Sequence, residues 1–320
     1  QSRSSAASDV YKRQCLSLCQ DVQGEIFDYP EEFFKERIHN IRRPKPDDFQ
    51  IKQAMEKIKK SKKPIIISGG GVFYSDAMDE LGSFAIKHNI PVTQTVMGYS
   101  TMKRDHSHFL GPIGGLGGRA ANNLAKETDL AICVGTKLAD FTTGSWANFE
   151  NPEFKLVSIN IARHDANKHL AEAVIGDAKV CLSELSNSLG NWKSPDSWHK
   201  KSQDELKSWN EYVDKESGPT NQETPNYAHA VGAIYRNSDP TDIAVTAAGG
   251  LVGEVVQVWR PKELNTHETE WGFSCMSYEI SGALGIKMAN PDKDVIAFVG
   301  DGSYLLNNSD IYSSVLTNNK

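Results

Sequence analysis

Short apolar runs alternate with amphipathic segments along most of the chain. The run PIIISGGG at 64–71 is continuously apolar and ends in glycines, which is typical of a strand buried on both faces of a parallel sheet. Residues 47–60 instead repeat their apolar positions at helical spacing, and Asp47 or Asp48 can cap that helix. The other predicted elements of this region are helices at 76–89, near 120–129 and at 178–189, and strands at 90–96, 130–135 and 155–161. This alternation predicts a doubly wound α/β domain at 47–190.

The pattern is interrupted at 191–224 and then restarts. This stretch is rich in Lys, Ser, Glu and Trp and predicts a polar linker with one helix around 196–216. The elements predicted after it are a helix with Pro225 in its first turn, strands at 242–250 and 294–302, and a helix near 276–289. We therefore expect a second α/β domain with a parallel sheet at 225–320, of which the chain holds the N-terminal part.

Composition adds limits to this picture. A length of 320 residues suits about two domains, and 39% hydrophobic and 24% charged residues with a net charge of -6 are ordinary for a globular protein. We expect no nucleic-acid partner and no membrane span, because no strongly basic region and no apolar run of ~20 residues occurs. The five cysteines lack CxxC spacing, which favours free thiols in the cytoplasm. Residues 1–14 show no apolar periodicity and are expected to be a non-native or disordered tail.

The strongest chemical signal is VGDGSYLLNNSD at 299–310, where an apolar strand leads into Gly-Asp-Gly-Ser and then a helix. A carboxylate at the C-terminal end of a parallel strand lies where α/β folds bind ligands. Asp301 is therefore a candidate ligand for Mg²⁺, which fills its other coordination positions with phosphate oxygens and water. Gly300 and Gly302 allow close approach of the backbone, and the Ser303 hydroxyl and amide can reach a phosphate oxygen. The tripeptide alone also fits a simple turn.

The sequence upstream of this motif carries a resemblance. AAGGLVGEV at 247–255 is another strand-to-glycine turn, and GFSCMSYEISGALGIKMANPDKD lies between it and GDGS. This order resembles the thiamine-diphosphate-binding domain of the acetolactate synthase and pyruvate decarboxylase superfamily. The resemblance implies that Gly249 and Gly250 form the turn that holds the diphosphate. It also implies that Met276 is the apolar wedge that keeps the cofactor bent, and that the Ser274 carbonyl receives the aminopyrimidine nitrogen. Apart from the resemblance, a helical Met is ordinary core filler.

The resemblance extends toward the N-terminus. GPIGGLGGRAANNLAKETDLAICVGTKLADFTTG at 111–144 is similar to the central domain of the same superfamily, and CQDVQGEIFDYP at 19–30 to the end of its pyrimidine-binding domain. We therefore expect 15–46 to be the end of that domain and a linker, in a chain that lacks most of the first domain and the end of the last. The catalytic residue stays unknown, because the resemblance places the activating glutamate in the first domain. It also implies a homodimer or homotetramer at full length.

Four segments narrow the resemblance to one branch of the superfamily. GFSCMSYEI, GDGSYLLNNSDIYSS, SINIARHDANKH and ADFTTGSW are most similar to the acylhydrolase branch of inositol breakdown. That branch implies thiamine diphosphate and Mg²⁺ as cofactors and a cyclic diketone substrate, trihydroxycyclohexane-1,2-dione, whose C–C bond between the carbonyls is hydrolysed to give 5-deoxy-glucuronate. Tyr278 and Glu279 then form a polar wall of the site, unless they face away as surface or packing residues. The alternative within the superfamily is an acetolactate synthase-like enzyme or a 2-oxo acid decarboxylase.

A second glycine motif gives an alternative of another class. GLGGRA at 115–120 fits the dinucleotide fingerprint, and Asp140 follows at the ~20-residue distance of the ribose-binding acid, which suggests an NAD-binding oxidoreductase. Against it, RDHSHFLGPIG before the glycines shows no apolar strand. A non-catalytic α/β scaffold is the third alternative. No Cys or carboxylate set completes a metal site around the local histidine pairs. We therefore expect four histidines in exposed loops: His106, His108, His164 and His169.

Overall fold

The computed structural model describes residues 17–38 and 40–318, so the expected tail at 1–14 lies outside the described residues. The chain divides into two compact units, of which the first ends at Arg43 and the second begins at Pro44. The first unit contains the short helix α1 (Gln20–Gln23) and the 3-10 turn η1 (Glu31–Phe34), neither of which has a buried residue. Both sheets therefore lie in the second unit.

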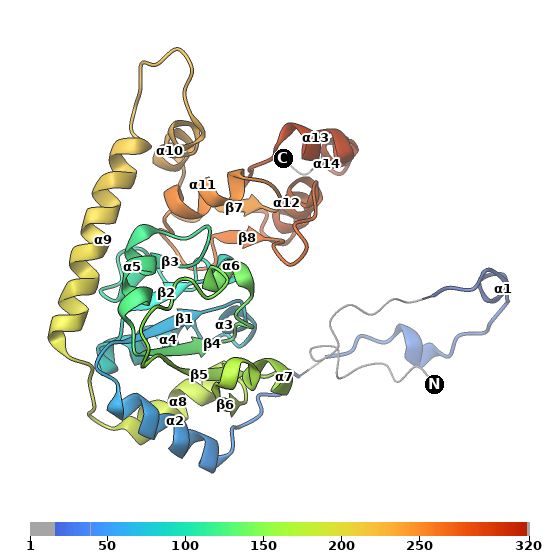
Figure 1. Ribbon diagram of the computed structural model, residues 1–320. Helices are drawn as coiled ribbons and strands as arrows, with labels where there is room; N and C mark the ends of the chain where they lie inside the picture. The colour runs from blue at the N-terminus through green and yellow to red at the C-terminus, as the bar shows by residue number, and fades with distance from the viewer. Residues whose placement is uncertain (1–16, 39, 319–320) are drawn as a thin grey trace. The chain divides into compact units, whose positions relative to one another are not determined.

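Six parallel strands form the first sheet in the order β3-β2-β1-β4-β5-β6 (Figure 1). Ile66 of β1 lies opposite Val92 of β2 and Ile132 of β4. The first strand is therefore central, and later strands are added on both sides of it. This confirms the doubly wound parallel arrangement. The strands are β1 (Pro64–Ser68), β2 (Val92–Gln94), β3 (Phe109–Pro112), β4 (Leu130–Val134), β5 (Lys155–Asn160) and β6 (Glu172–Ile175).

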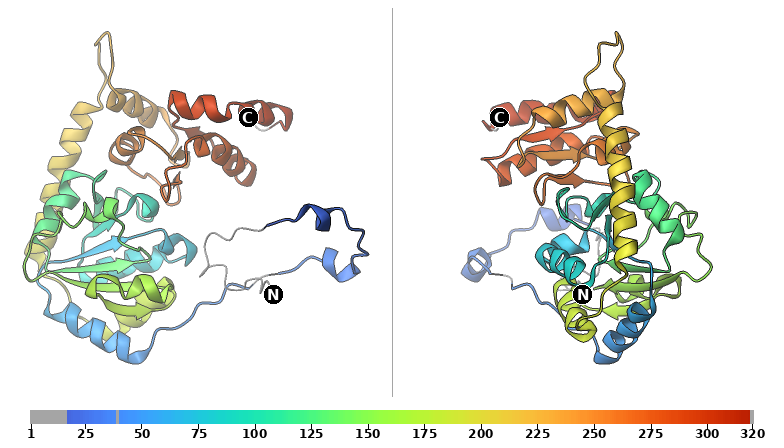
Figure 2. Two further views of the ribbon diagram at one scale, coloured as in Figure 1. Left: turned by 45° about the vertical axis from the view of Figure 1, so that its right-hand side comes forward. Right: turned by 90° about the vertical axis from the view of Figure 1, so that its left-hand side faces the viewer.

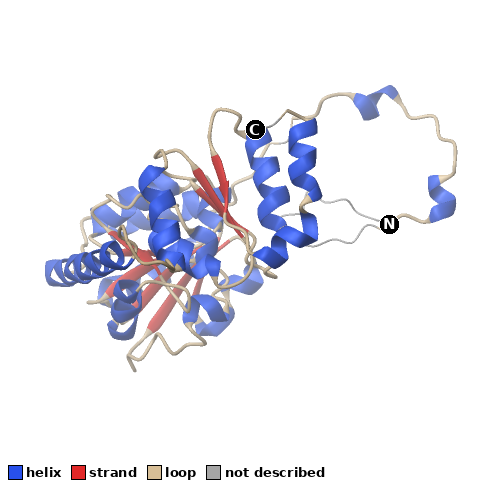
Figure 3. Ribbon diagram, turned by 90° about the horizontal axis from the view of Figure 1, so that it is seen from above, coloured by secondary structure: helices blue, strands red, loops and turns tan. Residues whose placement is uncertain are grey.

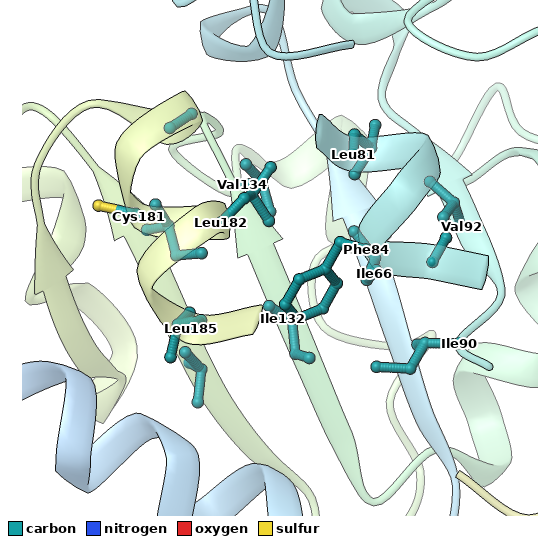
Figure 4. Packing of buried hydrophobic residues seen from close by; sticks show 14 of the residues in the cluster. Ile66, Leu81, Phe84, Ile90, Val92, Ile132, Val134, Cys181, Leu182 and Leu185 are labelled. Atoms are coloured by element: carbon teal, nitrogen blue, oxygen red, sulfur yellow. The ribbon is translucent and has the colours of Figure 1, made fainter. Parts of the chain in front are cut away.

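Helices cover both faces of this sheet (Figure 3). On one face Phe84 and Leu185 pack with Ile66 and Ile132 in a fully buried core, shown in Figure 4. On the other face lie α5 and the long helix α9, which runs along the side of the sheet domain (Figure 2). The helices of this region are α2 (Asp48–Lys60), α3 (Gly71–Tyr74), α4 (Met78–His88), α5 (Arg119–Glu127), α6 (Asp140–Thr143), α7 (Arg163–Ala166), α8 (Ala178–Leu189) and α9 (Asp196–Glu216), with the 3-10 turns η2 (Val96–Gly98) and η3 (Lys168–Leu170).

The local end signals act as the sequence predicts. The Asp47 side chain caps α2 by accepting the Phe49 amide at 2.9 Å, and Gly190 ends α8 with a φ of +63°. One signal is displaced, because Asn226 rather than Pro225 borders the next helix. Asn226 accepts the His229 amide while the His229 ring accepts the Asn226 amide, which is a capping box.

A second parallel sheet follows α9, in the order β8-β7-β9. Its strands are β7 (Ile243–Thr246), β8 (His267–Thr269) and β9 (Val295–Ala297), and its helices are α10 (Tyr227–Asn237), α11 (Leu251–Val258), α12 (Tyr278–Ala289), α13 (Asp301–Asn307) and α14 (Ser309–Leu316). The sequence predicted β7 and β9 but not β8. Its three residues are too short to show a periodicity. No helix in the described part of the chain is long and apolar enough to cross a membrane.

The two sheet domains share a packed contact within the second unit. Val96 and Tyr99, which follow β2, form a buried cluster with Val252 and Val256 of α11. Beside it, the Ser100 hydroxyl accepts the backbone amides of Thr266, just before β8, and of His267, the first residue of β8, each at 3.2 Å. The central sheet therefore fixes the start of β8 and the helix that follows β7.

Candidate functional site

Three loops meet at one edge of the second sheet, because its strands are parallel and their carboxyl ends lie together. The Ser274 hydroxyl, after β8, donates to the Ala247 carbonyl, after β7, at 3.4 Å. The Met276 Cε lies only 2.9 Å from the point where a Cβ on residue 302, after β9, would stand. The structure thus brings together the glycine turn, the Ser274–Met276 segment and the Gly-Asp-Gly turn.

The glycines of this edge face open space. Gly249 has a φ of +78°, which favours glycine, and it is exposed together with Gly250. Within 4 Å of an added Cβ at Gly249, Gly250 or Gly300, the described residues place no atom that would be met. The absence of side chains at these three positions therefore leaves room beside the backbone that no described residue fills.

Asp301 begins a helix rather than ending a strand, because β9 already stops at Ala297. Its carboxylate is exposed, and one oxygen accepts the Gly302 amide at 2.8 Å. Ser303 beside it is buried. No group of three His, Cys, Asp or Glu side chains suited to a metal occurs among the described residues, so Asp301 stands as a single carboxylate. One carboxylate beside an open glycine turn suits Mg²⁺ carried with a diphosphate, since Mg²⁺ fills its shell with phosphate oxygens and water.

Glu270 organises the loop after β8, and the sequence reasoning missed it. Its carboxylate accepts the amides of Phe273 at 3.0 Å and Cys275 at 2.7 Å. Burial by itself would raise the pKa of Glu270, but these hydrogen bonds outweigh it and hold the pKa below its usual range. The loop keeps Ser274 at a φ of +53° and leaves Met276 half exposed. A lone loop carboxylate gives no spacing from which this role follows.

Tyr278 and Glu279 differ in their surroundings although they are neighbours at the start of α12. Tyr278 is partly exposed, and burial of its ring raises the pKa of its hydroxyl. Glu279 is completely buried, and its Oε1 accepts the Ala248 amide at 3.2 Å. Of the two, Glu279 therefore turns inward and touches the turn that carries Gly249 and Gly250.

The dinucleotide alternative requires a correction. The expectation that no strand precedes the 115–120 motif is wrong, because β3 ends at Pro112, three residues before it; β3 was missed because it has four residues and contains Gly and Pro. The backbone amides of the glycine turn are nonetheless taken. Gly114 donates to the Asn122 side chain at 2.9 Å and Gly115 to the Phe141 carbonyl at 2.7 Å. Gly117 and Gly118 also donate to backbone carbonyls, so these amides are not free to bind a pyrophosphate.

The position of this motif in the sheet also argues against a dinucleotide. The fingerprint belongs after the first, central strand of the domain, whereas β3 is an edge strand. A Cβ on Gly114 would stand 2.0 Å from the Phe141 carbonyl oxygen. Leu116 at the tip of the turn packs toward α11, where it lies 3.3 Å from an added Cβ on Gly253. The glycines of this turn therefore serve close packing of the chain.

The expectation for the histidines is wrong at His108. This side chain is buried, with its ring stacked on His199 of α9 at 4.1 Å between centroids. Burial, reinforced by the nearby His199 and His106, lowers the pKa of His108 to about 4. His106 is partly buried. His164 and His169 are exposed as expected, but they lie in α7 and η3 rather than in loops. The error arose because α9, which covers His108, is about ninety residues away in the sequence.

Comparison with known proteins gives two family matches in chain order. Residues 51–185 match the thiamine pyrophosphate enzyme, central domain. Residues 247–319 match the thiamine pyrophosphate enzyme, C-terminal TPP binding domain, and this range contains all three loops of the candidate site.

Curated relatives are similar over nearly the whole chain. The 3D-(3,5/4)-trihydroxycyclohexane-1,2-dione hydrolase of Clostridium botulinum is 38% identical over 329 aligned positions, covering 96% of this chain and 51% of the relative. Proteins with the same name are 39% identical in Clostridium tetani, over 94% of this chain and 50% of the relative, and 38% identical in Bacillus anthracis, over 95% and 51%. The chain thus spans about half the length of the curated relatives it matches.

Proposed function

The chain belongs to the thiamine pyrophosphate enzyme family, and we propose that the full-length protein hydrolyses 3D-(3,5/4)-trihydroxycyclohexane-1,2-dione to 5-deoxy-glucuronate. The observation that carries the proposal is the extent of the similarity to proteins named as hydrolases of this dione. It covers 94–96% of the chain, and therefore both sheet domains and the linker as well as the cofactor motifs. This similarity extends beyond 51–185 and 247–319, the two ranges that the family models match.

The proposed cofactors are thiamine diphosphate and Mg²⁺, held at the edge where the three loops meet. Asp301 is the proposed metal ligand, since its exposed carboxylate borders the open turn at Gly300. When bound, thiamine diphosphate supplies a nucleophilic carbon and an electron sink. The residues proposed to contact the cofactor are Gly249, Gly250, Ser274, Met276, Gly300, Gly302 and Ser303.

In the proposed reaction, the residues of this chain position the cofactor and shield it. The Gly249 turn and Gly300 leave room for an anionic group, and the half-exposed Met276 side chain offers an apolar surface between the loops after β8 and β9. Glu270 holds the loop that carries Met276 through two amide hydrogen bonds. A homodimeric or homotetrameric assembly in the cytoplasm belongs to the proposal by resemblance to the family.

The test is a substrate comparison with the full-length protein. It is incubated with thiamine diphosphate and Mg²⁺, and separately with the cyclic dione and with pyruvate, while ring-opened acid, acetolactate and acetaldehyde are followed. We expect ring-opened acid from the dione and no product from pyruvate. Turnover of pyruvate with none of the dione would overturn the proposal and move the protein to the acetolactate synthase-like or decarboxylase alternative.

A further inference from the structure

A buried carboxylate lies directly behind the glycine turn of the proposed cofactor site. Glu279 in the first turn of α12 has no exposed surface. Its Oε1 accepts the Ala248 amide at 3.2 Å, one residue before Gly249. Its Oε2 is also buried and has no hydrogen-bond partner in the part of the chain that the structure describes. One oxygen of this carboxylate therefore has no donor among the described residues.

Such an arrangement is costly unless a further donor is supplied. Buried carboxylates are normally paired or fully hydrogen-bonded, because removing the charge from water carries a large penalty. The positive end of the α12 backbone favours an acid in its first turn, but an exposed acid would meet that role equally well. Of the other groups near this turn, Glu270 is an acceptor already occupied by two amides, and the Ser274 hydroxyl donates to Ala247. Neither serves Glu279.

We infer that Glu279 Oε2 accepts a hydrogen bond from an N–H or O–H donor of the ligand that binds at the Gly249–Gly250 turn. The inference rests on the proposed function, which provides two sources of that donor: the amino group on the pyrimidine ring of thiamine diphosphate and a hydroxyl of the cyclic dione. The open space beside Gly249 and Gly250 leaves room for a ligand at this turn. The amide of the preceding residue, Ala248, donates a hydrogen bond to the Glu279 carboxylate. Glu279 is thus a binding residue of the site.

The experiment replaces one acceptor atom by a donor. In Glu279→Gln of the full-length protein, the amide oxygen still accepts the Ala248 amide, while an NH₂ group takes the place of Oε2. A ligand donor then meets a donor, and we expect its binding to weaken by ~10-fold or more. The melting temperature without ligand should stay unchanged, because one buried polar atom without a hydrogen-bond partner replaces another. The matched control is Glu211→Gln at an exposed position of α9, which should leave both the ligand affinity and the melting temperature unchanged.

Two binding measurements separate the sources of the donor. Calorimetric titration with thiamine diphosphate and Mg²⁺ reports the cofactor, and KM for the dione at saturating cofactor reports the substrate hydroxyls. If the donor is the pyrimidine amino group, a thiamine diphosphate lacking that group should bind wild type and variant equally. If it is a hydroxyl, only KM for the dione should rise.

The outcomes that overturn the inference are distinct from failure of the proposed function. Unchanged cofactor affinity together with unchanged KM in Glu279→Gln, or a lowered melting temperature without ligand, would make the carboxylate a part of the protein's own packing. If wild type neither binds thiamine diphosphate nor hydrolyses the dione, the proposed function itself fails.

Discussion

Both sheets of this protein carry glycine-rich turns at the carboxyl ends of their strands, yet the glycines have opposite surroundings. In the six-stranded sheet a Cβ on Gly69 would stand 2.5 Å from the Gly135 carbonyl oxygen, and one on Gly98 2.4 Å from that of Ser68. In the three-stranded sheet, no described atom lies within 4 Å of a Cβ on Gly250 or Gly300. The first set is enclosed by backbone, and the second borders open space.

This difference separates two reasons for placing glycine after a strand. A glycine can allow two backbones to touch, or it can allow a ligand to reach the backbone. The two reasons look alike in the sequence, as the GLGGRA and AAGG segments illustrate. Only the surroundings of the missing side chain distinguish them, and four experiments test how the two regions differ.

The largest expected effect separates two similar aspartates, Asp301 and Asp140. Each is the exposed first residue of a short helix that follows a strand. Asp301 follows the three-stranded sheet, whose glycine turns are open, and Asp140 follows the six-stranded sheet, whose glycine turns are enclosed. We expect Asp301→Ala in the full-length protein to reduce kcat by ~1000-fold or more, because the proposed metal loses its carboxylate. Asp140→Ala should keep near-normal activity. Near-normal turnover of Asp301→Ala at saturating Mg²⁺ would reduce Asp301 to a turn residue.

A methyl group placed on each kind of glycine should act on different quantities. Gly69→Ala should lower the free energy of unfolding by ~3 kcal/mol, because the methyl overlaps rigid backbone at Gly135. Gly250→Ala should leave stability within ~1 kcal/mol of wild type, since its φ of -69° suits alanine and its Cβ meets no atom of the described residues. It should instead weaken thiamine diphosphate binding. Urea unfolding and calorimetry measure the two effects, and equal stability losses would contradict the comparison.

Low pH should reduce the free energy of unfolding through a buried histidine where the two sheet domains meet. His267 of β8 is buried against Tyr99, with ring centroids 5.3 Å apart, and burial lowers its pKa to about 4. In the unfolded chain its pKa is ~6.5, so from pH 6.5 down to about 4 the unfolded state binds more protons. Stability from this residue is therefore complete above pH 6.5 and falls as the pH drops, by ~3 kcal/mol at most.

The measurement is the free energy of unfolding at pH 7 and pH 5. We expect His267→Gln to lose less stability between these values than wild type, whereas His164→Gln, at an exposed position, should follow wild type. An identical pH slope in the His267 variant would mean that this ring is not held neutral by its burial.

We expect NAD to have no effect on the melting temperature. Because Gly114 and Gly115 already donate their amides to Asn122 and Phe141, NAD should leave the melting temperature unchanged within ~1 °C, even at millimolar concentration. Thiamine diphosphate with Mg²⁺ is the positive control on the full-length protein. A clear rise with NAD would show that the enclosed glycine turn opens, and it would restore the dinucleotide alternative.

The sequence alone determined the features that depend on residues close together in the chain, such as helix periodicity, caps and turns. The helix at 47–60 with a cap at Asp47 or Asp48, the stop at Gly190 and the alternation of helices with apolar strands all follow from spacing and turn chemistry. The structure confirms them and identifies Asp47 as the cap. The GDG motif and the segments around it led to the family by resemblance, and the family matches agree. These features are local because a helix cap or a period of apolar residues acts within a few neighbouring residues.

Tertiary structure decided the rest. The strands β3, β6 and β8 have three or four residues each, so they become strands by pairing with neighbours that are distant in the chain. His108 is buried because α9 covers it, and Glu279 faces inward because the turn after β7 offers it the Ala248 amide. Whether a glycine is enclosed or open depends in the same way on which backbone lies opposite, and that is settled only when the chain has folded.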